Sequence, residues 1–313
     1  MLVAERGVSV ESMPRRRWGR ESNPLLIKEL RGRMRGARAF VVLTVYLLLL
    51  SCFTSIIYYA YTSSATSGGG PDMADLGQII FVAVVIIEIF MVTFITPAFT
   101  AGAISGERER QTYELLRTTL LSAPKLVFGK LYAALTYMLL LILAAVPLES
   151  VAFVLGGVVI EELAIALVIL LVTALLFAVI GLLFSAFLRS TLAATVLAYI
   201  VALLLTIGLP VLMLISIGIV DTMMYNIDPT RWMWKALLMY VIFLLLSLSP
   251  ISAAVATEVF LHDDNVIFLY WYDIGSTHRI PILSPWITYS LIYLGVALVL
   301  LLIIILRVRR QET

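Results

Sequence analysis

The sequence has little charge, almost no histidine and a single cysteine. Only 13% of its 313 residues are charged, while 62% are hydrophobic and the mean hydropathy is +1.05. A water-soluble domain needs far more polar surface, so this composition excludes one. The one cysteine, Cys52, can form no intrachain disulfide, and cysteine usage therefore says nothing about the redox compartment.

The scarcity of histidine limits catalysis. His262 and His278 fall in the same predicted loop, which excludes a His-based metal site or a Ser–His dyad inside a bilayer. Acidic neighbours in that loop offer further metal ligands, but their spacing is not diagnostic, and we predict no metal site. No Gly-x-x-x-x-Gly-Lys-Ser/Thr loop occurs either, so we predict that this chain binds no ATP, holds no cofactor and is not an enzyme.

The sequence is rich in long apolar stretches. Each is about as long as a helix that crosses roughly 30 Å of hydrocarbon, and no ten-residue alternation suggests a β-barrel. We therefore predict an all-α polytopic membrane protein with spans at 39–62, 78–103, 130–156, 163–188, 192–219 and 285–306. A further stretch, 235–256, is interrupted by Ser247, Ser249 and Pro250, and we interpret it as re-entrant or peripheral.

Basic residues predict the orientation, because cytoplasmic loops retain Lys and Arg. With six spans, all but three of the 22 Lys and Arg residues lie on one side, the exceptions being Arg231, Lys235 and Arg279. Both termini are then cytoplasmic, in a multi-pass protein of the plasma membrane. We expect a cytoplasmic N-terminal segment, 1–38, without a cleavable signal, and a single membrane domain, 39–313. The net charge of +2 is explained by topology, so we expect no nucleic-acid partner.

The N-terminal segment has the pattern of an interfacial helix. Asn23 is suited to cap a helix and Pro24 to begin it. Basic residues then recur every three or four positions along one face, at Lys28, Arg31, Arg35 and Arg38, and apolar residues line another. Such a helix lies on anionic lipid headgroups. The alternative is a simple positively charged anchor.

Residues 105–129 form the most charged connection between two predicted spans. Opposite charges lie three or four residues apart, which stabilises a surface helix by a few tenths of a kcal/mol per pair. We predict a short helix from Glu107 to Arg117 that receives mechanical force from a docked partner protein. The charged residues expected to contact this partner are Glu107, Arg108, Glu109, Arg110, Glu114 and Arg117. The alternative is a solvated loop.

Three segments resemble the type-2 exporter (ABC-2) permeases of ATP-binding-cassette transporters. Asn23-Pro24 followed by Lys28-Glu29-Leu30 is similar to the family's N-terminal connecting helix, and Leu248-Ser249-Pro250 matches the region before the last span. The specific block resembles the coupling helix and comprises Gly106-Glu107-Arg108-Glu109, Thr112, Glu114-Leu115-Leu116, Ser122 and Gly129-Lys130. Gln111 stands where the family often has Gly, and Leu120 where it often has Pro.

The resemblance implies a function for the whole chain. It implies a homodimer or heterodimer of permease chains, a separate ATPase subunit that binds Mg-ATP and docks near residues 105–124, and export by alternating access or lateral release. It also implies a short outer re-entrant helix between the last two spans. The alternative is a membrane scaffold or assembly factor that transports nothing.

Two carboxyl groups fall inside predicted spans, where an unpaired charge costs at least about 2.5 kcal/mol. They belong to Glu88 and Glu149. Either lines a translocation path or holds a cation, or both are protonated or hydrogen-bonded packing residues, with Glu149 near the outer interface.

Overall fold

The protein is helical almost throughout. The computed structural model describes residues 37–65, 72–111, 123–226, 232–264, 267–274 and 278–310. In chain order the elements are α2 (Ala37–Ala65), α3 (Met73–Thr100), α4 (Ser105–Glu109), α6 (Ala123–Val154), α7 (Ile160–Phe187), α8 (Thr191–Leu203), the π-helix η1 (Leu204–Gly208), α9 (Leu209–Asn226), α10 (Trp232–Leu246), α11 (Pro250–Asp264), β1 (Leu269–Ile274), β2 (His278–Leu283) and α12 (Pro285–Arg310). The predicted all-α fold is confirmed.

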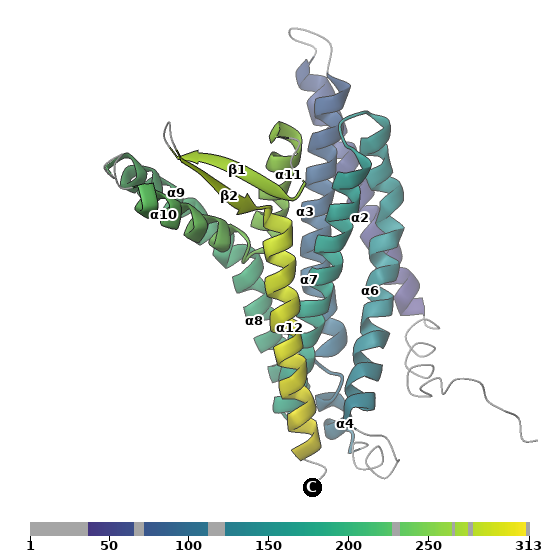
Figure 1. Ribbon diagram of the computed structural model, residues 1–313. Coiled ribbons are helices and arrows are strands. Elements are labelled where there is room, and N and C mark those ends of the chain that lie inside the picture. The colour runs from purple at the N-terminus through teal and green to yellow at the C-terminus, as the bar shows by residue number, and fades with distance from the viewer. Residues whose placement is uncertain are drawn as a thin grey trace, which may run out of the picture.

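Six helical segments of the described chain are long and apolar enough to cross a membrane, as predicted. They are α2, α3, α6, α7, α8 with η1 and the start of α9, and α12. The most buried is α7, which packs against α3, α6, α8 and α12. Figure 1 shows α4 at the same end of the bundle as the end of α12, and we call this the α4 end. The opposite end, toward which the β1–β2 hairpin lies, is the hairpin end.

Helix boundaries extend beyond several predicted spans. The second span begins at Met73 rather than 78, because Asp72 caps the helix by accepting a hydrogen bond from the N–H of Ala74 (3.0 Å). The third begins at Ala123 rather than 130. Hydropathy marks the part of a helix that lies in hydrocarbon, whereas the helix itself continues until a cap or turn ends it.

The last third of the chain departs from a simple bundle. The fifth span contains the π-helix η1, where Thr206 and Thr93 of α3 share a buried hydrogen bond (3.3 Å). Beyond it, α9 and α10 diverge from the bundle (Figure 1). α10 and α11 are bent by 119° at a short break, and both of their outer ends lie toward the hairpin end. This geometry agrees with the re-entrant interpretation of 235–256.

The β-hairpin was not predicted. β1 and β2 pair antiparallel, with Leu269 opposite Leu283, and Ile274, Ile280 and Ile282 point into a small cluster with α10. The sequence predicted a loop that contains His262 and His278, whereas β2 begins at His278. The signal was weak because Leu269–Ile274 shows no strict alternation of apolar and polar residues, and Pro281 falls inside the second strand.

Candidate functional site

A buried serine anchors the turn between α3 and α4 to α7. The Oγ of Ser185 accepts hydrogen bonds from the backbone N–H groups of Ile104 (2.8 Å) and Ser105 (3.0 Å). The hydroxyl of Ser105 donates to the carbonyl of Ala101 (3.0 Å). Both serines are fully buried. Because a buried unpaired N–H costs about 1–3 kcal/mol, these bonds favour one position for α4 against α7.

The end of α4 is bonded to the start of α8. One carboxylate oxygen of Glu109 accepts from the backbone N–H of Thr191 (2.7 Å), and the other accepts from its hydroxyl (2.8 Å). Thr191 is the first residue of α8, where backbone N–H groups have no partner within the helix. A negative charge is favourable at this position because of the helix dipole. Glu109 therefore serves as an N-terminal cap supplied by another element.

A third connection joins α4 to α6. Nζ of Lys130 lies 3.5 Å from Oε1 of Glu107, and the Lys130 side chain is only 4% exposed. A buried cation requires a counter-charge, so this pair constrains the distance between α4 and α6. The two residues border a cleft of about 300 Å³ at the α4 end, which Gly102, Phe99 and Arg110 also line.

The predicted helix from Glu107 to Arg117 is not continuous. α4 ends at Glu109, and Gln111 adopts a left-handed backbone with φ of 58°. A non-glycine residue in this region ends a helix at a cost, which glycine avoids. Gln111 is also the residue that stands where the family often has Gly, so the difference from the family lies at the position where α4 ends. The rest of that prediction, including Glu114 and Arg117, lies outside the described residues.

The N-terminal predictions also lie outside the described residues. They concern the proposed interfacial helix, with Lys28, Glu29, Arg31 and Arg35. Of the predicted coupling residues, the structure describes Glu107, Arg108, Glu109 and Arg110, all in or beside α4. Ser185 and Thr191 were not predicted as contacts of α4. A serine inside an apolar span and a threonine at a helix start are common, and nothing in the sequence shows that these two face α4.

The two intramembrane glutamates lie together. Glu88 of α3 and Glu149 of α6 are fully buried and close enough for their carboxyl groups to interact. The hydroxyl of Tyr46, on α2, donates to Oε1 of Glu88 (3.1 Å). Neither glutamate lines the cleft at the α4 end. The sequence could not reveal this pairing, because the two residues are on different helices.

No group of three His, Cys, Asp or Glu side chains in the described part of the chain is arranged to hold a metal ion. His278, one of the residues considered as a ligand, stacks on the ring of Trp232 (4.4 Å between centroids). The described polar sites include the anchored α4 and the glutamate pair.

Six apolar spans, two of which are connected through the short polar helix α4, define a multi-pass membrane protein. The family model for ABC-2 family transporter proteins matches residues 24–312, almost the entire chain. This chain therefore belongs to the ABC-2 transporter family, which confirms the resemblance and makes the chain an ABC transporter permease. No curated protein gives a significant match to it.

Proposed function

We propose that this permease is the membrane-spanning subunit of an ABC exporter, driven by a separate nucleotide-binding subunit. That subunit would bind and hydrolyse Mg-ATP, and the permease would form a homodimer or heterodimer. The observation that carries the proposal is the attachment of α4 to three spans at once. Lys130 links it to α6, Ser185 to α7 and Thr191 to α8.

These attachments make α4 suitable for transmitting movement. A force applied to a free loop would be absorbed by rotation about its own backbone. A force applied to α4 would instead displace the ends of α6, α7 and α8 together, because these are rigid helices and α7 packs against both of the others. We propose that the ATPase docks on residues 105–124, with Glu107, Arg108, Glu109, Arg110, Glu114 and Arg117 as coupling residues, and that the segment with Lys28, Glu29, Arg31 and Arg35 contributes an interfacial helix.

The distribution of charge supports a cytoplasmic α4 end. Arg108 and Arg110 lie at α4, Arg189 lies between α7 and α8, and Arg307 and Arg309 lie in the last turn of α12. All are at the α4 end, and retention of basic residues marks the cytoplasmic side. We therefore propose a plasma-membrane location with both termini in the cytoplasm and transport directed outward.

The decisive experiment compares variants of the complex reconstituted in proteoliposomes with its ATPase. In Glu109→Ala the ATPase should still co-purify, while permease-dependent ATP hydrolysis falls at least about fivefold, because α8 loses its bond to α4. Reversal of charge in Glu107→Lys combined with Glu109→Lys should also reduce ATPase docking.

Arg309→Ala is the control, because it removes an exposed charge from the same end without touching α4. Full ATP hydrolysis in Glu109→Ala, together with unchanged docking after charge reversal, would contradict the proposed coupling site. A wild-type complex without ATP hydrolysis would instead favour a scaffold.

A further inference from the structure

The cleft of about 300 Å³ at the α4 end lies between α3, α4 and α6 and has two different walls. The polar wall consists of Glu107, Arg110 and Lys130. The other wall contains small and apolar residues from the end of α3 and the turn after it, among them Ala98, Phe99 and Gly102. A space of this size admits a small organic group.

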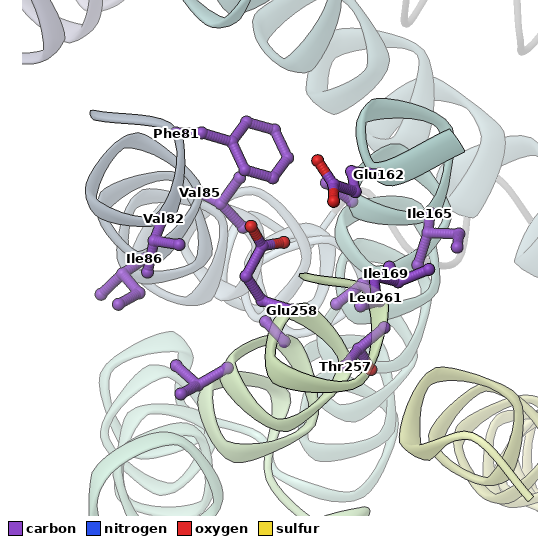
Figure 2. Close-up of a pocket in the computed structure, with 13 residues that line it drawn as sticks. Phe81, Val82, Val85, Ile86, Glu162, Ile165, Ile169, Thr257, Glu258 and Leu261 are labelled. Atoms are coloured by element: carbon purple, nitrogen blue, oxygen red, sulfur yellow. The ribbon is translucent and has the colours of Figure 1, made fainter. Parts of the chain in front are cut away.

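A second cavity, between α3, α7 and α11, is much smaller. Figure 2 shows Glu162 of α7 and Glu258 of α11 pointing into it. Its volume is about 20 Å³, which is room for about one water molecule. Of these two spaces, only the cleft at the α4 end can therefore admit a larger ligand.

The described residues that line the cleft carry a net positive charge. Arg110 and Lys130 are basic, and Glu107 is the only acidic residue among them. The Lys130 side chain is 4% exposed, so water and salt screen its charge less than that of a surface lysine. Arg110 is exposed, and its guanidinium group has five N–H donors. An anion with one negative charge therefore matches the charge of this lining.

The cleft lies at the level where two membrane spans end. Phe99 is in the last turn of α3, and the span that contains α3 continues to Glu109. Lys130 is near the start of α6, the next span. Lipid headgroups occupy this level, and basic pockets between spans on the cytoplasmic side bind anionic headgroups. The apolar wall suits the first part of an acyl chain, which a water-soluble anion lacks.

We propose that this cleft binds an anionic phospholipid of the inner leaflet, with its phosphate group against Arg110 and Lys130 and its glycerol and first methylene groups against Ala98 and Phe99. A guanidinium group donates two parallel hydrogen bonds to phosphate, and an ammonium group adds a point charge. A lipid bound here holds α4 against α3 and α6. This assignment depends on the proposed cytoplasmic position of the α4 end.

Native mass spectrometry of the full-length permease, titrated with phosphatidylglycerol in a nonionic detergent, tests the site. The wild type should bind one phosphatidylglycerol molecule more tightly than those that follow. Phosphatidylcholine with the same acyl chains has no net charge and should bind at least about fivefold more weakly. Inorganic phosphate has the charge without the acyl chains, and a millimolar excess should not displace the lipid.

Two variants should change the first binding step in opposite directions. Arg110→Gln removes a positive charge and should weaken it about fivefold. Glu107→Gln removes the negative charge and should tighten it, and a gain in affinity cannot result from misfolding. Arg309→Gln is the matched control, because Arg309 is an exposed arginine at the same end that does not line the cleft.

Equal affinity for phosphatidylcholine would overturn the proposal. So would displacement by inorganic phosphate, an equal loss in Arg110→Gln and Arg309→Gln, or weaker binding in Glu107→Gln. The assay contains no ATPase, and the coupling proposal is tested at Glu109, which does not line the cleft. Failure of one proposal is therefore distinguishable from failure of the other.

Discussion

Single residues decide how closely the helices of this protein approach one another. Gly157, in the turn between α6 and α7, lies directly against the backbone of α3. A methyl group there would overlap the carbonyl oxygen of Ala74 and crowd the amide of Gln78. Backbone atoms cannot rotate away as a flexible side chain does, so the contact requires glycine.

Gly157→Ala should therefore destabilise the bundle by about 1–3 kcal/mol through overpacking. Thermal unfolding of the purified protein in detergent measures the effect. Gly295→Ala in α12 is the control, because nothing lies within 4 Å of the added carbon, and its stability should be unchanged or slightly raised. Equal unfolding temperatures for the two variants would contradict the close approach.

The buried pair Glu88 and Glu149 also affects the stability of the bundle through single side chains. Glu88→Ala should cost roughly 2–4 kcal/mol, because it leaves a cavity and removes the acceptor of the Tyr46 hydroxyl. Glu88→Gln keeps that acceptor, and its unfolding temperature should stay much closer to that of the wild type.

A role for Glu88 and Glu149 in the translocation path is a separate proposal. It predicts lower transport by Glu88→Gln even when folding is intact. Undiminished transport by this variant in proteoliposomes would leave the pair a packing role only.

At the scale of elements, α4 depends on the residue that ends it. Gln111 has a left-handed backbone, which costs a residue with a side chain about 1 kcal/mol. Gln111→Gly should remove this cost and slow hydrogen exchange across residues 105–111 several-fold. Gln111→Val should accelerate it, because a β-branched residue fits this conformation worse. Identical exchange in the three proteins would show that the turn does not limit the stability of α4.

At the scale of the whole molecule, the bundle predicts which residues share a side of the membrane. In a background where Cys52 is replaced by alanine, an impermeant maleimide added to intact cells should label Asp75→Cys and not Arg309→Cys. Asp75 lies in the exposed first turn of α3 at the hairpin end, and Arg309 lies at the α4 end. Labelling of Arg309→Cys from outside would contradict cytoplasmic termini.

The bent pair α10–α11 gives a sharper version of the same test. Trp234 and His262 are exposed near the outer ends of the two helices. A re-entrant segment places both on the outer side, so Trp234→Cys and His262→Cys should both react with the external reagent. A segment that crosses the membrane would expose only one of them.

The sequence by itself indicated a lipid bilayer as the surroundings of this chain, six apolar spans and the family. Backbone groups must be paired inside hydrocarbon, so each apolar stretch of about twenty residues becomes a helix whatever its neighbours do. The block from Gly106 to Lys130 indicated the family through its resemblance to the coupling-helix region of ABC-2 permeases, and the family model matches residues 24–312.

Only the tertiary structure decided which residues meet. Glu109 bonds to Thr191, Glu88 lies beside Glu149, and Glu162 faces Glu258, in each case across helices far apart in the chain. The membrane spans are apolar on nearly all sides, so no polar stripe in the sequence shows which face of a span turns inward. Small residues such as Gly157 and Gly181 allow close contact, and it is this packing that sets the rotation of each helix and brings the polar groups together.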